Sequence, residues 1–260
     1  MTSLDTTSFD HAFGLFMQNS KRDCKLVLKQ QAKLLTVDCA KLTPPFSKAV
    51  FGNPSSESFA AQKRIGDAAV RTQVTGLFMP AANMSDVKGA LGPKTARLLK
   101  GYLASGEFQK FKTFLERRKV QTQFVESANV GLHSASRDRG GRVRKKANML
   151  VFNADSIRAV LKEKLSHVGR AKAGWKKAAV LFGVSLPGWI TRHETLGDAR
   201  DDTDDPTNPS VTIWNKVSYA SELASNSELR IIERALAFRA RAMMRQVENY
   251  QNKRAAEFSR

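Results

Sequence analysis

Histidines and glycine-rich loops occur in this sequence without the spacings that chemistry needs. The chain has four histidines: His11, His133, His167 and His193. None of them is spaced from another histidine or from a cysteine as the ligands of a zinc ion are. In residues 89–95, Pro93 stands where a phosphate-binding loop needs a backbone N–H, and residues 183–188 lack the spacing of a nucleophile elbow. We therefore predict no catalytic residue, no cofactor and no bound metal, and we predict that the protein is not an enzyme.

A group of carboxylates in residues 194–209 is the densest set of possible cation ligands. Its members are Asp198, Asp201, Asp202, Asp204 and Asp205. Carboxylate oxygens suit a hard cation such as Ca²⁺, but the segment lacks the spacing, the glycine and the final glutamate of an EF-hand. We interpret residues 194–209 as a solvated loop. The alternative is an inter-subunit acidic loop that meets a basic patch on a neighbouring copy of the chain.

The opposite charge is concentrated in Arg137–Lys146, around the pair Gly140-Gly141. Its six cations are Arg137, Arg139, Arg142, Arg144, Lys145 and Lys146. Three interpretations stay open: a solvated surface loop, an electrostatic contact with DNA phosphates, or a contact with an acidic partner subunit. No zinc finger, helix-turn-helix or aromatic RNA-binding pattern accompanies these cations, so we do not expect recognition of a specific nucleotide sequence.

The composition agrees with a folded, basic protein. The chain has 260 residues, of which 42% are hydrophobic, so it can bury a core. Its formal net charge of +19 suggests a polyanion or an acidic protein surface as a partner. No apolar run reaches the roughly 18 residues that a membrane span needs, and residues 1–5 do not begin a signal peptide. Cys24 and Cys39 lie about 22 Å apart if one helix carries both, so we expect free thiols.

The periodicity of apolar residues predicts an α+β fold with a small, mostly antiparallel sheet, several helices and a long C-terminal helix. Expected strands lie at 120–126, 149–152 and 211–219. Expected helices lie at 25–42, 58–78, 95–104, 107–118, 155–168, 170–182 and 228–258. We expect an N-terminal arm at residues 1–22 and a single domain at 23–260, with a helical insertion at about 46–118.

The expected core joins four apolar surfaces. They are the stripe of residues 28–42, the strand at 149–152, the helix face that holds Trp175, and the early part of the final helix. Pro44-Pro45 ends the first helix, because proline disfavours helical geometry in the residue before it. Ser58 and Ser185 are expected N-caps.

The order of these segments resembles that of tail-completion and neck proteins of long-tailed bacteriophages. An amphipathic helix runs into Thr43-Pro44-Pro45, Gly169–Trp175 precedes Pro187–His193, and Ile213–Ala220 precedes the final helix. The similarity covers about 25–45 and 150–250. The family's usual acidic-Thr-Gly sequence after Thr-Pro is replaced here, and so is its Glu-x-Gly after Tyr-Ala.

This resemblance implies a non-enzymatic structural subunit of a virion. Such proteins form rings at the junction of head and tail or at the tail end, beside portal and tail proteins and around a DNA channel. The implied location is the virion, assembled in the host cytoplasm, with no membrane. Two other hypotheses stay open: a nonspecific basic nucleic-acid-binding protein, and another minor capsid or head-completion subunit.

Overall fold

A computed structural model describes residues 7–47, 50, 53–83, 88–89, 91–117, 119, 123–137, 149–205, 207–217 and 229–258. The fold is α+β, as the sequence predicts. The chain divides into two compact units, in place of the expected single domain with an insertion at 46–118. Unit 1 combines Met1–Lys63 with Gly169–Arg260, and unit 2 is Arg64–Val168.

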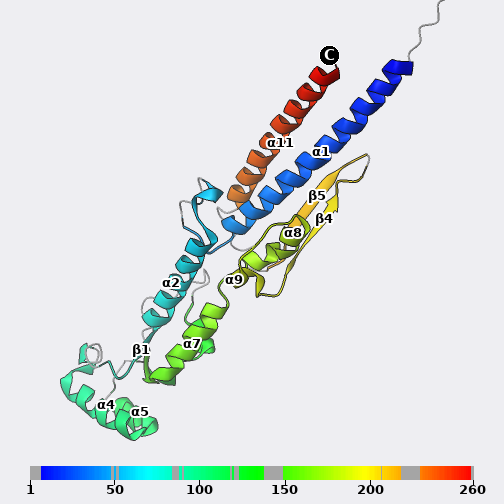
Figure 1. Cartoon of the computed structure of the whole chain (residues 1–260). Coiled ribbons are helices and arrows are strands. Elements are labelled where there is room, and N and C mark those ends of the chain that lie inside the picture. Colours follow the sequence, from blue (N-terminus) through cyan, green and yellow to red (C-terminus); the bar gives the residue numbers. More distant parts are fainter. Residues whose placement is uncertain are drawn as a thin grey trace, which may run out of the picture. The chain divides into compact units, whose positions relative to one another are not determined.

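Two long helices form one side of unit 1. Helix α1 spans Thr7–Leu42 and helix α11 spans Leu229–Phe258. They lie side by side with opposite chain directions (Figure 1). Residues 7–22, which we expected to belong to an N-terminal arm, instead form the first turns of α1. Residues 1–6 lie outside the described residues.

Polar pairs fix the register of α1 against α11. The Asp23 carboxylate pairs with Arg254 Nε at 2.9 Å, and the Asp38 carboxylate pairs with Arg239 Nε at 2.7 Å. Between them, Gln31 Nε2 donates to Gln246 Oε1 at 2.9 Å. Steps of eight and seven residues along α1 match the same steps backwards along α11, so the two helices are antiparallel. Shifting this register would leave the carboxylates of Asp23 and Asp38 buried without their arginines.

Short elements and a hairpin cover α1 on its other side. They are the 3-10 turn η2 at Pro54–Ser56, the 3-10 turn η3 at Lys172–Trp175, helix α8 at Lys176–Leu181 and helix α9 at Gly188–Thr191. The expected continuous helix at 170–182 is thus a 3-10 turn followed by a short helix. Helix α9 begins after Pro187, so Ser185 is not its N-cap.

The hairpin corrects the expected loop at 194–209. Strand β4 spans Gly197–Asp202 and pairs antiparallel with β5 at Ser210–Asn215, with Gly197 opposite Asn215. Strand β4 could not be predicted from apolar periodicity, because its aspartates leave it without alternating apolar residues. The strand is held by backbone pairing with β5. Of the expected strand at 211–219, residues 218 and 219 lie outside the described residues.

Unit 2 contains a three-stranded parallel sheet in the order β1-β3-β2. Its strands are β1 at Phe78–Pro80, β2 at Phe124–Ser127 and β3 at Met149–Asn153. The prediction of a mostly antiparallel sheet is therefore wrong for this larger sheet, whose strands are parallel. Helices connect its strands, and such crossovers bring the chain back in the same direction.

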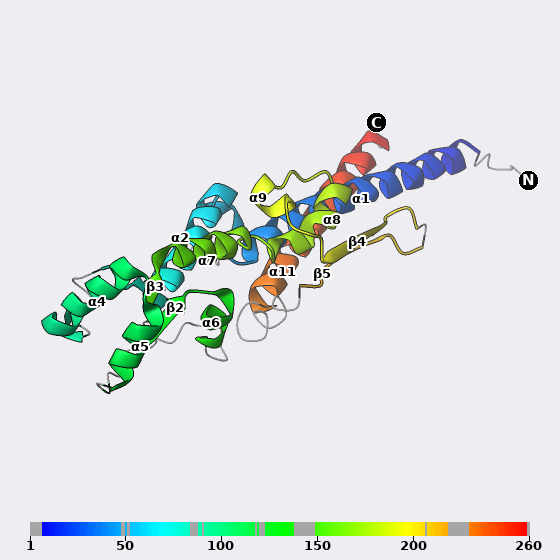
Figure 2. The ribbon, with the colours of Figure 1, turned by 90° about the horizontal axis from the view of Figure 1, so that it is seen from below.

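Most of the described helices of unit 2 begin and end close to the predicted positions. The helices are α2 at Phe59–Leu77, which starts at the end of unit 1, α4 at Pro93–Ser105, α5 at Phe108–Arg117, α6 at Val130–Ala135 and α7 at Ala154–Ser166. Helix α6 has no counterpart in the prediction from the sequence. Ser58 caps α2 as predicted, since its Oγ accepts from Ala61 N at 3.1 Å. Figure 2 shows α2 and α7 side by side.

The apolar residues form separate clusters in place of the single core that we expected. Residues of β3 pack with those of α2, α4, α5 and α7 in unit 2. Trp175 packs with Cys39, Ala40 and Ile190 in unit 1. In the early part of the final helix Leu236 is 45% exposed, and the side chains of residues 229–235 lie outside the described part of the chain. β3 and Trp175 therefore belong to separate apolar clusters, one in each unit.

Candidate assembly site

A buried polar junction forms where α1 ends. Thr43 follows the last turn of α1, and its hydroxyl accepts from Trp175 Nε1 at 2.8 Å. The same hydroxyl donates back to Cys39 O at 2.8 Å. The Trp175 side chain is buried, as predicted. Thr43 therefore ties the end of α1 to the turn η3, more than a hundred residues later in the chain.

Lys172 lies at the centre of this junction and is fully buried. Its Nζ donates to Ala40 O at 2.8 Å, to Gln62 Oε1 at 2.8 Å and to Thr43 O. Two of these acceptors are carbonyls from the last turn of α1 and just beyond it, which have no partner within the helix. The ammonium group thus closes the end of the helix from outside.

The electrostatics of Lys172 follow from its burial. Loss of solvent lowers the pKa of Lys172 to about 7, while the charge of Glu57 acts in the opposite direction. Glu57 is itself held in place, since its carboxylate accepts from Ser47 N at 3.1 Å. An amine enclosed by carbonyl groups has no path to a substrate, so we assign Lys172 a structural role.

The pH dependence of stability tests this burial. The pKa of Lys172 is lower in the folded chain than in the unfolded chain, so between about pH 7 and pH 10.5 the unfolded chain binds more protons. Stability should therefore rise with pH in this window, by about 2 kcal/mol between pH 7 and pH 9. Urea unfolding measures this rise. The rise should be absent in Lys172→Met, and an equal rise in that variant would contradict the assignment.

The hairpin joins the same junction through Asn215, the last residue of β5. Its side-chain Nδ2 donates to Ala171 O at 2.9 Å, and its Oδ1 accepts from Val217 N at 3.0 Å. Glycines allow this approach: a Cβ on Gly174 would lie 1.9 Å from Asn215 Oδ1. A Cβ on Gly197 would lie 1.7 Å from Gly174 O. The turn η3, the start of β4 and the end of β5 are therefore in direct contact at these two glycines.

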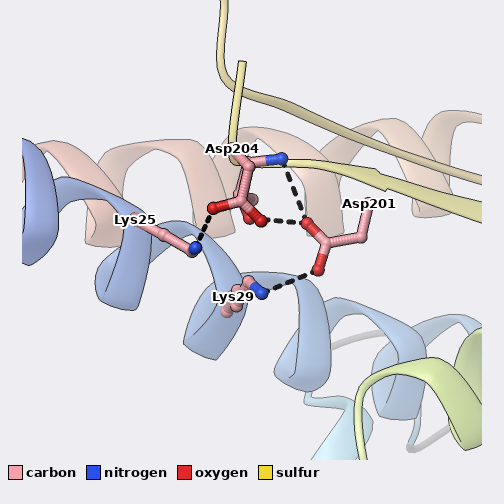
Figure 3. A network of polar contacts seen from close by, with 5 residues as sticks. Lys25, Lys29, Asp201 and Asp204 are labelled. Atoms are coloured by element: carbon pink, nitrogen blue, oxygen red, sulfur yellow. Dashed lines mark hydrogen bonds and ion pairs between the residues drawn. The ribbon is translucent and has the colours of Figure 1, made fainter. Parts of the chain in front are cut away.

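The acidic residues lie on the hairpin, and two of them face α1 (Figure 3). Asp201 accepts from Lys29 Nζ at 2.9 Å, and Asp204 pairs with Lys25. Burial by itself would raise the pKa of Asp201, but hydrogen bonds from Thr203 and Lys29 outweigh it and lower that pKa. These ion pairs hold the hairpin against α1 of the same chain.

The other three acidic residues also have partners within the chain. Asp198 pairs with Lys177 at 3.3 Å, and Asp202 pairs with Arg200 at 2.7 Å. Asp205 accepts from the backbone of Thr207 and Asn208, which closes a turn. An acidic contact with a second subunit would have to compete with these interactions.

The structure describes only the first residue of the predicted basic segment. Arg137 lies in unit 2, and one of its terminal guanidinium nitrogens donates to Gln73 Oε1 at 2.9 Å. The remaining five cations lie outside the described residues: Arg139, Arg142, Arg144, Lys145 and Lys146.

Helix α11 carries a surface that sequence reasoning missed. A shallow hollow on it is lined by Phe238, Arg241, Met244, Arg245 and Glu248. Phe238 is 53% exposed and Met244 is 60% exposed. These residues recur every three or four positions and turn away from the polar pairs that face α1. The periodicity was visible in the sequence, but only the position of α1 shows which face of α11 is left open.

Other kinds of site find no support among the described residues. No group of three or more histidine, cysteine or acidic side chains there could hold a metal ion. Cys24 and Cys39 are free thiols, and burial, together with the charge of Asp38, raises the pKa of Cys39 to about 12. None of the described helices is long and apolar enough to cross a membrane.

Comparison with known proteins gives no relative of this chain. No protein-family model matches the chain, and neither the curated proteins nor the solved structures give a match.

Proposed function

We propose that the protein is a non-enzymatic structural subunit of a bacteriophage virion that assembles into a ring at the neck, head–tail connector or tail end. One observation carries the proposal. Three of the segments behind the phage resemblance contact one another at a single buried junction: Thr43-Pro44-Pro45, Gly169–Trp175 and the described part of Ile213–Ala220. Segments that pack together as a unit are a stronger basis for a shared fold than short sequence similarities.

The exposed face of α11 supplies a surface for the neighbouring subunit. Phe238 and Met244 offer apolar area, and Arg241 and Arg245 flank it with positive charge. Apolar patches rimmed by charge are typical of protein interfaces. In this proposal the ring contacts portal or tail proteins on its two sides and DNA in its channel.

Native mass spectrometry of the full chain over a range of concentrations tests the proposal. We expect one closed oligomer, because a ring stops growing when it closes, whereas an open contact gives a series of sizes. Phe238→Glu and Met244→Glu should weaken the assembly at least about tenfold, since each places a carboxylate in an apolar contact.

Val180→Glu is the matched control. Val180 lies on α8 and is 76% exposed, so this change adds the same charge at an apolar surface position elsewhere in unit 1. It should leave the assembly unchanged. A chain that stays monomeric at every concentration, or equal loss in all three variants, would contradict the proposal.

A nonspecific nucleic-acid-binding protein is the second candidate, favoured by the net charge of +19. Its affinity for duplex DNA should fall steeply with salt and should not depend on sequence. Neutralising Arg137, Arg139, Arg142, Arg144, Lys145 and Lys146 should then reduce the salt slope by at most about 5. Fluorescence anisotropy at several salt concentrations measures this slope. An unchanged slope would place the DNA contact elsewhere in the chain.

A further inference from the structure

Three helices of unit 2 pack on a shared apolar cluster and carry polar residues close in sequence to its members. Val74 of α2, Leu132 of α6 and Val160 of α7 belong to this cluster. Gln73 and His133 are the direct neighbours of the first two, and Lys164 follows one turn after the third. Arg137 comes one turn after His133, and its hydrogen bond to Gln73 joins it to α2.

His133 is buried in an unusual way. Its side chain is 1% exposed, yet neither Nδ1 nor Nε2 has a hydrogen-bond partner in the part of the chain that the structure describes. The Nε of Arg137 is also buried without a partner there. A buried polar group without a partner destabilises the fold, so these nitrogens of His133 and Arg137 point to a ligand.

The charges around His133 identify the kind of ligand. Burial, together with the charges of Arg137 and Lys164, lowers the pKa of His133 to about 4. Burial and the charge of Arg137 lower the pKa of Lys164 as well, against the opposite effect of Glu163. In the described residues neither Arg137 nor Lys164 forms an ion pair with a carboxylate. The missing element is therefore negative charge.

We propose that His133, Arg137 and Lys164 form a binding site for a phosphoryl group. A phosphate oxyanion accepts several hydrogen bonds at once, and arginine and lysine are its usual partners. Its charge would offset the repulsion between the two cations and give an acceptor to Arg137 Nε and to the one N–H of the neutral His133 imidazole. Arg137 and Lys164 are both partly exposed, so a phosphoryl group can reach them from solvent, whereas the imidazole of His133 is buried. This site stands independently of the proposed ring.

Titration of the full chain with inorganic phosphate tests the site. Calorimetry measures the binding, and the NMR signals of the His133 imidazole report its protonation. We expect saturable binding, and we expect bound phosphate to raise the pKa of His133 from about 4 toward its usual range. Arg137→Gln and Lys164→Gln should each weaken binding about tenfold or more, because each removes a charge-assisted hydrogen bond.

Lys162→Gln is the matched control, because Lys162 is an exposed lysine on the same helix and the variant loses the same charge. It should bind phosphate as the wild type does. Absence of saturable binding, an unmoved pKa of His133, or equal weakening in Lys162→Gln would overturn the proposal. Displacement of phosphate by a short DNA duplex would identify a nucleic-acid backbone as the source of the phosphoryl group, and no displacement would assign the site to free phosphate.

Discussion

Trp175→Ala should destabilise unit 1 more than any other removal of a single side chain. The indole is buried among Cys39, Ala40 and Ile190, and its Nε1 holds the Thr43 hydroxyl at the end of α1. Truncation leaves a large cavity and breaks this link, so we expect a loss of about 3–5 kcal/mol in the free energy of unfolding. Urea unfolding followed by far-ultraviolet circular dichroism measures the loss.

Two further variants separate volume from hydrogen bonding. Trp175→Phe keeps most of the ring but removes the N–H donor, so it should cost less than Trp175→Ala, about 1–2 kcal/mol. Trp214→Ala removes a partly exposed indole from β5 and should have a smaller effect than either. A Trp175→Ala chain as stable as the wild type would show that the junction contributes nothing to the fold.

Gly197→Ala should be nearly as damaging, although it adds only one methyl group. The new Cβ would lie 1.7 Å from Gly174 O and 2.6 Å from Trp214 O. Both obstacles are backbone atoms, so no side-chain rotation relieves the clash, and β4 must move away from η3 or from β5. We expect a loss of more than about 3 kcal/mol and weaker holding of the hairpin.

Gly188→Ala provides the control for this substitution. A Cβ on Gly188 meets no atom within 4 Å, so the change should alter stability by less than about 0.5 kcal/mol. Tryptophan fluorescence is the suitable measurement, because Trp175, Trp189 and Trp214 all lie in unit 1. If Gly197→Ala unfolds at the same urea concentration as Gly188→Ala, the close contact between η3 and β4 is wrong.

Local patterns in the sequence were enough to find most of the helices. The boundaries of α2, α4, α5, α7 and α11 lie within about two residues of the predicted ones, because an apolar stripe and its caps are encoded in neighbouring residues. The same holds for the buried strand β3 and for the burial of Trp175. Phe108 and Phe111 are buried and Phe114 is partly buried, as their spacing indicates. The rings of Phe111 and Phe124 lie edge to face with their centroids 5.0 Å apart.

Only the tertiary structure decided how these elements combine. Strand β4 forms because β5 pairs with it, and Lys25 and Lys29 of α1 neutralise its turn, none of which a local pattern can show. The sequence around Lys172 does not distinguish it from a surface lysine. Its acceptors, such as Ala40 O and Gln62 Oε1, lie more than a hundred residues earlier in the chain. A lysine can be exposed or buried with no difference in the local sequence. Contacts between residues far apart in the chain determine whether its ammonium group finds partners inside the fold.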